Sequence, residues 1–271
     1  MIPQDYITEW GQRAPWKNRV YLEQDLIISR LLVELFNHHE ISKKLAFRGG
    51  TALYKLYISP PARYSEDIDL VQTNTEPIGE VLGIMKKIIS PVLGKAKWKL
   101  NEGRATLIYR FVSEETPAVS SKIKIEINTR EHFSVFGFRE KDFTVNSRWF
   151  SGKTKIQTYE FSELMATKLR ALYQRKKGRD LFDIWLSMQH CDLDIKKTVT
   201  AFQQYMRHQK LNITRAMFEE NLASKLESSV FMGDLSPILA SHISWDMADA
   251  AKQLQEQLLS LLPGKPWVRK Q

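Results

Sequence analysis

Hydrophobic residues follow two different patterns along the chain, and the change lies near Tyr159. Beyond that residue, apolar side chains recur at helical spacing with little alternation. Before it, three helical stretches, at about 6–39, 52–57 and 77–93, are separated by shorter apolar runs that are typical of strands. The later pattern predicts five successive helices, at about 159–175, 179–190, 194–207, 213–226 and 244–262.

The shorter apolar runs predict a sheet. The clearest run is 121–128, where isoleucine alternates with polar residues and so creates one apolar face and one polar face. The candidates for strand or extended chain are 45–48, 67–71, 96–100, 105–112 and 121–128. These elements predict an α/β (α+β) fold, in which a small mixed sheet is followed by a C-terminal helical bundle.

The same change of pattern predicts two domains. A chain of 271 residues exceeds the usual size of a single compact domain. We place the boundary so that residues 1–155 form the N-terminal domain and residues 156–271 form a helical domain. The sequence contains no internal repeat and no low-complexity tract.

Composition and charge narrow the setting. The chain has 40 Lys and Arg against 31 Asp and Glu, and its net charge of +9 favours a polyanionic partner. The single cysteine, Cys191, excludes an internal disulfide and fits a reducing cytoplasm. The opening residues form neither a basic leader nor an apolar run. We therefore expect a cytoplasmic protein with no membrane partner.

Two carboxylates stand two residues apart in the strand candidate 67–71. Side chains at this spacing point to the same side of a strand, so Asp67 and Asp69 share one face and Ile68 enters the other. Adjacent carboxylates repel each other, and a hard divalent cation such as Mg²⁺ or Mn²⁺ relieves that repulsion while also holding substrate phosphates. An exposed edge strand with two solvated acids is the alternative.

A Gly-Gly-Thr turn precedes this strand, at the start of a predicted helix. Gly49 and Gly50 allow close approach of a ligand, and the backbone N–H groups of such a turn bind phosphate oxygens. The alternative is that Thr51 is an ordinary helix N-cap. The turn therefore predicts a phosphate site when it is considered together with the aspartate pair.

A third acid lies on the polar face of the strand 121–128. Alternation places Glu126 on the same face as Lys122 and Lys124, where it would join the two aspartates at a metal site. A cross-strand salt bridge from Glu126 to a basic residue such as Arg110 is the alternative. Sequence alone leaves both interpretations open.

The first two C-terminal helices carry charges at unusual positions. Lys168 falls within the apolar arc of its helix, so it either extends along its stem to solvent or reaches a carboxylate or phosphate. In the next helix, Arg179, Asp180, Asp183 and Ser187 share one polar arc. That arc is either solvated surface or part of a site.

Taken in order, these features resemble the AbiEii/AbiGii toxin family. The matching motifs are FRGGTAL at 47–53, RYSEDIDL at 63–70, Lys168, and RDLFD at 179–183. The resemblance spans most of the chain. This family belongs to the DNA polymerase beta-like nucleotidyltransferase superfamily, so the resemblance implies a nucleotidyltransferase fold at the N-terminus and a helical domain that completes the active site.

The resemblance also implies roles for the N-terminal residues. Asp67 and Asp69 are expected to be catalytic and to bind Mg²⁺ or Mn²⁺. The nucleotide-binding group that it implies comprises Gly49, Gly50, Thr51 and Ser65, with Ser65 bordering the metal site. Glu126 matches the third carboxylate of the superfamily by position and alternation only.

Two residues of the C-terminal motifs receive roles in the same way. Lys168 is implied to be catalytic and to contact the nucleotide phosphates. Asp183 is the preferred catalytic acid of the last motif. Asp180 is the competing choice, because both acids lie on the polar arc. The alternative for Asp180 is a local pair with Arg179 or Lys176.

The resemblance implies a bacterial toxin that transfers a nucleoside monophosphate from a nucleoside triphosphate to RNA, with the tRNA 3′ end favoured, and so blocks translation. A cognate antitoxin is an expected partner, and phage defence is the expected setting. Nucleotidylation of a protein or small molecule, or a non-catalytic nucleotide- or nucleic-acid-binding module, are the other hypotheses. The basic residues that fit an RNA partner are Arg48, Arg63, Arg170, Arg175, Lys176, Lys177, Arg179 and the tail Lys265–Lys270.

Overall fold

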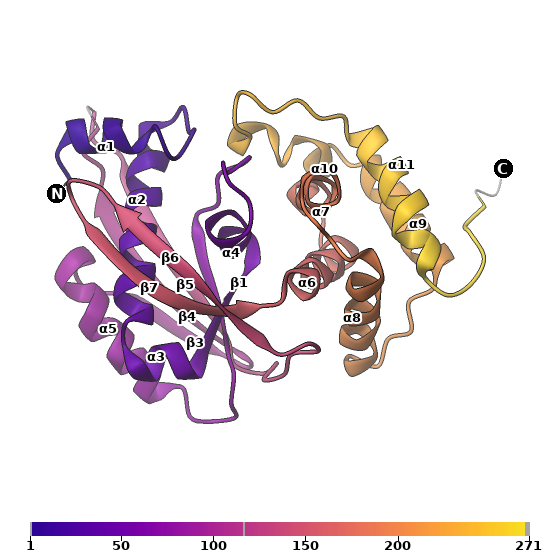
Figure 1. Ribbon diagram of the computed structural model, residues 1–271, viewed down its shortest axis with the longest axis horizontal. Coiled ribbons are helices and arrows are strands. Elements are labelled where there is room, and N and C mark those ends of the chain that lie inside the picture. Colours follow the sequence, from indigo (N-terminus) through magenta and orange to yellow (C-terminus); the bar gives the residue numbers. More distant parts are fainter. Residues whose placement is uncertain (1, 116, 269–271) are drawn as a thin grey trace. The chain divides into compact units, whose positions relative to one another are not determined.

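A computed structural model describes residues 2–115 and 117–268 (Figure 1). Its contacts divide the chain into two compact units, Met1–Tyr159 and Glu160–Gln271. Within the described ranges, the first unit contains a seven-stranded mixed sheet with helices, and the second contains helices only. The mixed α/β fold predicted from the sequence is confirmed. The division follows Tyr159 because the last strand ends there, and the predicted boundary between 155 and 156 falls inside that strand.

The sheet of the first unit places the aspartate strand between two other strands. Strand β2 is paired in parallel with β5 and in antiparallel fashion with β1. The outer pairs are antiparallel, and β1 joins β7 in parallel. In sheet order the strands are β3 (Lys97–Asn101), β4 (Arg104–Val112), β5 (Ser120–Asn128), β2 (Asp67–Gln72), β1 (Leu45–Arg48), β7 (Ser151–Tyr159) and β6 (Phe138–Asn146).

Strands β6 and β7 have no counterpart among the predicted elements, so the sheet is larger than the small one expected. In β6 only Phe143 and Val145 are buried, and charged residues occupy both faces, which hides the alternation. Strand β7 is fixed to β1 by the Thr158 hydroxyl, which donates to the Phe47 carbonyl at 2.7 Å. Long-range pairing, rather than local pattern, creates this edge of the sheet.

The predicted single helical stretch at 6–39 is wrong, because the helix is interrupted at 11–18 and again at 37–38. The second helix begins at the Asn18 cap, whose side chain accepts a hydrogen bond from the Val20 N–H at 2.9 Å. Pro15 within the break also disfavours a continuous helix. The helices of this unit are α1 (Gln4–Trp10), α2 (Arg19–Phe36), α3 (His39–Lys44), α4 (Gly49–Leu56) and α5 (Gly79–Leu93).

The core of the first unit lies between the sheet and its helices. Helix α2 packs on β5, β6 and β7, and it also contacts α3 and α5 (Figure 1). On β5, Ile123, Ile125 and Ile127 are fully buried, as the alternation predicts. The opposite face of the central strands is therefore the one that carries the polar residues.

The second unit contains the helices predicted for the C-terminal half. Helix α6 packs against α7, α8 and α9. The predicted helix 244–262 is shorter than expected and is followed by a 3₁₀ turn, and two short elements were not predicted, α10 and η1. The elements are α6 (Phe161–Gln174), α7 (Gly178–His190), α8 (Ile195–His208), α9 (Arg215–Leu226), α10 (Ser229–Gly233), η1 (Ser236–Ile238), α11 (Met247–Gln257) and η2 (Leu259–Leu261).

The helices show no membrane-spanning character. Across the described part of the chain, none combines the length and the apolar content that a membrane crossing needs. The longest, α2, has 18 residues and carries buried polar side chains, among them Glu23 and Asp25.

Glu23 is a buried acid in the core of the first unit. Glu23 is 1% exposed, and one of its carboxyl oxygens accepts a hydrogen bond from the Glu114 N–H at 3.1 Å. The other oxygen has no hydrogen-bond partner among the described residues. Burial raises the pKa of Glu23 from its ordinary 4.5 to about 7.

This raised pKa predicts a pH-dependent stability. Between pH 4.5 and about 7 the folded state retains a proton that the unfolded state releases, so stability falls as the pH rises through this window. Glu23→Gln, which keeps an acceptor oxygen, should exceed wild type at pH 8 by on the order of 2 kcal/mol and match it near pH 4.5. Urea denaturation at both pH values measures the difference. The exposed Glu220→Gln is the control, and equal pH profiles for all three proteins would contradict the prediction.

Candidate active site

The two aspartates lie on one face of β2, as predicted. Asp67 and Asp69 are half-buried, whereas Ile68 and Leu70 on the opposite face are fully buried. The strand is central in the sheet and not an exposed edge strand. The alternative of two solvated acids at a sheet edge is therefore wrong.

The Gly-Gly turn packs directly against this acidic face. Gly49 has φ +82°, and a Cβ there would lie 2.3 Å from Asp69 Oδ2. A Cβ on Gly50 would lie 2.6 Å from Arg63 Nη2 and 3.0 Å from Ser65 Oγ. Neither position has room for a side chain, so the glycines bring the start of α4 beside Asp69 and Ser65.

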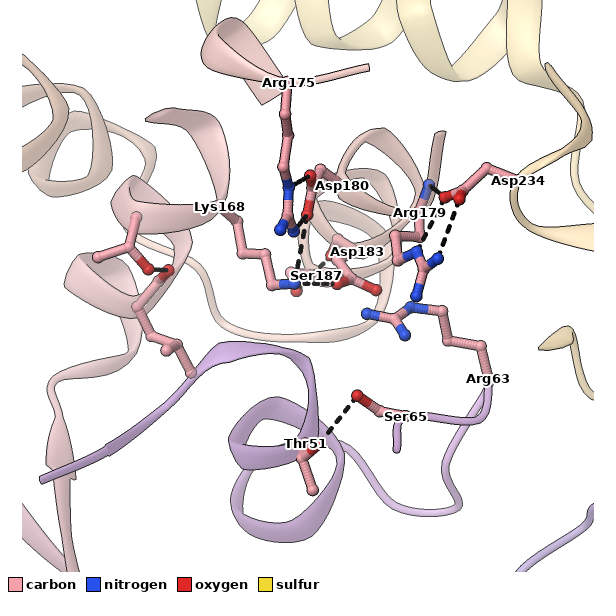
Figure 2. A network of polar contacts seen from close by, with 12 residues as sticks. Thr51, Arg63, Ser65, Lys168, Arg175, Arg179, Asp180, Asp183, Ser187 and Asp234 are labelled. Carbon is pink, nitrogen blue, oxygen red and sulfur yellow. Dashed lines mark hydrogen bonds and ion pairs between the residues drawn. The ribbon is translucent and has the colours of Figure 1, made fainter. Parts of the chain in front are cut away.

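Thr51 joins this turn to the beginning of β2. Its hydroxyl is hydrogen-bonded to Ser65 Oγ at 2.9 Å, as Figure 2 shows, and it donates to the backbone carbonyl of Asp67. Thr51 is therefore not the N-cap of α4. The N-cap is Arg48, whose own side chain makes no cap hydrogen bond. Such a helix start favours an anion.

Strand register brings charged groups to the two sides of Asp69. Arg48 on β1 is paired with Asp69, and Asp69 is paired with Glu126 on β5. The Arg48 guanidinium lies 3.3 Å from Glu131 Oε2. Glu126 is therefore adjacent to the aspartates in the sheet, as alternation predicted.

Lys124 is a cation that lies close to both Asp67 and Glu126. Its Nζ lies 3.0 Å from Asp67 Oδ2 and 3.5 Å from Glu126 Oε1. Burial acts to lower the pKa of Lys124, but the ion pairs with Asp67 and Glu126 outweigh it and raise that pKa. Lys124 therefore stays protonated and offsets the repulsion between the acids.

Glu126 takes part in the salt bridge that sequence analysis left open, but with different partners. Arg104 Nη1 lies 3.6 Å from Glu126 Oε1, and Lys124 is the second cation. Arg110, the partner suggested from the sequence, pairs with Lys122 in the strand register instead. Among the residues described, no group of three or more His, Cys, Asp or Glu side chains is arranged to hold a metal ion. The role of Glu126 as a metal ligand stays a prediction.

The donor set on β2 fits a hard divalent cation. Asp67 and Asp69 supply carboxylate oxygens from one face, and Mg²⁺ is commonly held by one or two carboxylates together with water and substrate phosphates. The close contact of Gly49 with Asp69 leaves the backbone N–H groups of α4 nearby for those phosphates. Lys124 provides the competing positive charge.

The second unit contains a separate cluster of buried charges. Lys168 Nζ on α6 lies 2.8 Å from Asp183 Oδ2 and 3.4 Å from Asp180 Oδ1, both on α7 (Figure 2). All three residues are at most 4% exposed. Lys168 therefore does not extend to solvent, and the arc with Asp180, Asp183 and Ser187 is not solvated surface. The two alternatives considered from the sequence, a solvent-exposed Lys168 and a solvated polar arc, are therefore wrong.

The two acids of this cluster have different partners. Arg175, which follows α6, donates from Nε and Nη2 to the two carboxyl oxygens of Asp180 at 2.7 and 2.8 Å. The local partner of Asp180 is thus Arg175, and not Arg179 or Lys176. Asp183 has the shorter contact with Lys168. The assignment of Lys168 and Asp183 as catalytic residues stays a prediction.

Much of the basic group expected to contact RNA is engaged within the second unit. Arg179 binds Asp234 (Figure 2), with its Nε 2.9 Å from Asp234 Oδ2. Lys177 Nζ lies 3.2 Å from Asp234 Oδ1. Burial acts to raise the pKa of Asp234, but these contacts lower it to about 2. Arg170 is buried with its guanidinium over the Tyr205 ring.

Three members of that group lie on the surface, and two lie outside the described residues. Of the three, Arg175 is paired with Asp180. Lys176 and Lys265 are exposed. The predicted tail continues to Arg269 and Lys270, which lie outside the described residues. The net positive charge of the second unit is therefore less available to a polyanion than the sequence suggests.

The cations that balance the acids could not be predicted from the sequence. Lys124 was placed on the correct face, but its ion pair with Asp67 depends on the parallel register of β2 and β5. Arg175 was interpreted as surface charge, although its position three residues before α7 lets it reach the first turn of that helix. Register and helix orientation are the missing signals.

Gly49→Ala tests the close contact at the aspartate strand. The added Cβ meets Asp69 and forces a residue with φ +82° out of its favoured region, so stability should fall by about 1–3 kcal/mol. Gly83→Ala in α5 is the matched control, because nothing lies within 4 Å of its Cβ position and alanine should stabilise that helix by up to about 1 kcal/mol. Urea denaturation measures both. Opposite signs are expected, and equal effects would contradict the packing described.

Lys168→Met tests the buried cluster of the second unit. It leaves two buried carboxylates short of a cation and should cost about 3–5 kcal/mol. Arg175→Met should cost only about 1 kcal/mol, because the Arg175 side chain is 53% exposed. The free energy of unfolding, followed by circular dichroism, measures both. Similar small losses would show that Lys168 is not held as a buried ion.

Comparisons with known proteins agree with the motifs and the fold. A profile of the family described as nucleotidyl transferase AbiEii toxin, type IV TA system, matches residues 30–253. The comparison with curated proteins gives no match.

Two solved structures illustrate the shared fold. MenT4, a nucleotidyltransferase toxin from Mycobacterium tuberculosis H37Rv, has a TM-score of 0.70 and 16% identity, and the match covers 97% of this chain and 91% of that one. JHP933 from Helicobacter pylori has a TM-score of 0.57 and 18% identity, with 90% and 92% covered. The family profile spans the Gly-Gly turn, the aspartate strand and most of the helical unit, so this chain belongs to the AbiEii family of nucleotidyltransferase toxins of type IV toxin–antitoxin systems.

Proposed function

We propose that this nucleotidyltransferase transfers a nucleoside monophosphate from a nucleoside triphosphate to the 3′ hydroxyl of an RNA, namely tRNA, in a reaction that depends on Mg²⁺ or Mn²⁺. The observation that carries the proposal is the placement of Asp67 and Asp69 on one strand face directly against the Gly49 turn. A metal-binding carboxylate pair and a phosphate-binding helix start are the two parts that nucleotidyl transfer requires.

Each group of residues has a separate task in this reaction. The turn at Gly49, Gly50 and Thr51 holds phosphate oxygens through backbone N–H groups, while Ser65 keeps Thr51 oriented. Asp67 and Asp69 hold the divalent cation, which supplies positive charge to the triphosphate when bound. Lys124 offsets the charge of Asp67 before substrate binds.

The bonds and protons of the reaction balance without any further reactant. The acceptor oxygen forms a bond to the α-phosphorus, and the bond from that phosphorus to the bridging oxygen of the β-phosphate breaks. Pyrophosphate leaves with the electron pair. The acceptor proton passes to Asp69, Glu126 or water, all of which are weak bases suited to an already polarised hydroxyl.

The acceptor assignment follows from charge and from the chemistry of tRNA. A net charge of +9 supports a polyanionic acceptor over a neutral small molecule. A nucleotide added to the tRNA 3′ end occupies the terminal 3′ hydroxyl and moves the end of the chain away from the ribose that must carry the amino acid, and so blocks translation. A protein that stops growth in this way needs a cognate antitoxin in the same cell.

The decisive test uses wild type and Asp69→Asn with total tRNA, Mg²⁺ and each labelled nucleoside triphosphate in turn. Asp69→Asn keeps the side-chain shape beside Gly49 but removes a charged ligand, so transfer should fall by roughly 100-fold or more while folding is retained. Asp142→Asn, an exposed acid on β6, is the matched control and should behave as wild type.

This experiment tests the RNA acceptor and the metal site by different outcomes. If label entered only a protein or a small molecule, the acceptor would be of that class and not RNA. Full activity of Asp69→Asn would instead remove the metal site from the mechanism. Loss of transfer when a chelator is added, with recovery on adding Mn²⁺, is the expected companion result.

A further inference from the structure

We propose that the single-stranded 3′ end of the acceptor RNA binds in a groove of the N-terminal unit lined by Tyr21, Arg110 and Lys122, with its hydroxyl end toward Asp67. This inference rests on the proposed function, because it names where the acceptor of that reaction lies. These three residues lie on α2, β4 and β5, respectively.

The groove has a volume of about 680 Å³, which is within the ~300–1,000 Å³ typical of sites for small organic molecules. It therefore has room for a nucleotide-sized group. Helix α2 and strands β4 and β5 form its sides, together with the segment before β2. The lining residues that matter here are Tyr21, Gln24, Glu66, Arg110, Glu115 and Lys122.

Strand register places the groove next to the aspartates. Lys124 on β5 is paired with Asp67, and Lys122 lies two residues earlier on the same face, a separation of about 7 Å. Arg110 on β4 is the register partner of Lys122 and shares that face. The positive end of the groove is thus about one nucleotide away from the aspartate strand.

The groove also lies on the side of the aspartates that the chemistry requires. In the sheet, Asp69 stands between Arg48 on β1 and Glu126 on β5. Gly49 follows Arg48, so the phosphate-binding turn is on the β1 side. Phosphoryl transfer holds the attacking and leaving oxygens roughly in line, on opposite sides of the phosphorus. If the leaving pyrophosphate lies toward β1, the acceptor must approach from β5 and β4.

Charges in the groove give the RNA a direction. Arg110 and Lys122 are exposed, and neither has an ion pair within the described ranges. Glu115 is already bound by Arg19 at 2.6 Å. Glu66 is the acid adjacent to Asp67, and a carboxylate accepts hydrogen bonds from ribose hydroxyls but repels phosphate. Backbone phosphates therefore lie at Arg110 and Lys122, and the 3′ hydroxyl lies toward Asp67.

Tyr21 provides an aromatic surface for a base. Its ring stacks on Tyr64 with centroids 4.0 Å apart and an interplanar angle of 6°. Tyr64 is 2% exposed and donates its hydroxyl hydrogen to Gln24 Oε1 at 2.7 Å. Gln24 Nε2 in turn donates to the Lys122 carbonyl at 2.9 Å. The Tyr21–Tyr64 pair is therefore connected to β5, the strand that carries Lys122. Bases of any identity can stack on such a ring.

The first test reverses the two groove charges. Arg110→Glu/Lys122→Glu should weaken binding of a short single-stranded RNA with a free 3′ hydroxyl at least ten-fold, measured by fluorescence anisotropy. Loss of two phosphate contacts should also reduce the slope of log K against log salt by about 1.4. Lys153→Glu/Lys155→Glu on β7 makes the same change in net charge away from the groove and should leave the salt slope unchanged.

The second test separates base stacking from charge. Tyr21→Phe keeps the ring and should retain wild-type RNA affinity, whereas Tyr21→Leu should weaken it roughly ten-fold. Thermal unfolding of each variant shows whether the fold is retained. The direction of the strand is tested with the same RNA carrying a 3′ phosphate, which should bind more weakly because its added charge lies beside Glu66 and Asp67.

Failure of the groove and failure of the transfer reaction are distinguishable. Unchanged RNA affinity and salt slope in the charge-reversed variant would overturn the groove, even if wild type labels tRNA. RNA binding that depends on the groove without any labelling would support the groove and refute the reaction. Loss of antitoxin binding with RNA binding intact would reassign the surface to a protein partner and overturn the inference.

Discussion

Mutual repulsion between Asp67 and Asp69 is the constraint around which the N-terminal unit is organised. A strand that carries two acids on one face needs nearby compensation, and its central position lets both neighbouring strands supply it. Lys124 from β5 forms the ion pair with Asp67, while Arg48 from β1 stands beside Asp69. Because Gly49 has no side chain, Asp69 can lie against the start of α4. The two carboxylates therefore lie beside the Gly49 turn, which is the predicted phosphate-binding site.

The second unit solves a similar problem inside a helical core. Asp180 and Asp183 are both fully buried, and Lys168 and Arg175 compensate them. Well-packed apolar residues would often give equal or greater stability at such positions, so a buried ion cluster is weak evidence of a stabilising role. The presence of this ion cluster in the core therefore favours a function that needs charged side chains. The buried charges therefore favour the functional role of Lys168 and Asp183, which stays a prediction.

The features that could be predicted from the sequence are those fixed by local pattern. Helical spacing located the C-terminal helices, and alternation placed Glu126 and Lys124 on the face of β5 that adjoins the aspartates. Features that depend on long-range pairing were missed. Strands β6 and β7 have polar residues on both faces, so no period marks them, and the ion pair of Lys124 exists only through the register of two parallel strands.

Net charge is a poor guide to a nucleic-acid surface unless the partners of each cation are known. The basic residues near α7 looked like a phosphate-binding group in the sequence, yet Arg175 and Arg179 are bound by buried carboxylates of their own unit. A guanidinium already paired in this way must lose one partner to gain another, so its net contribution to RNA affinity is small. Arg110 and Lys122 face no such exchange among the residues described. The cations that have no ion pair within the described part of the chain, rather than the total charge of +9, therefore indicate that the acceptor binds at the sheet.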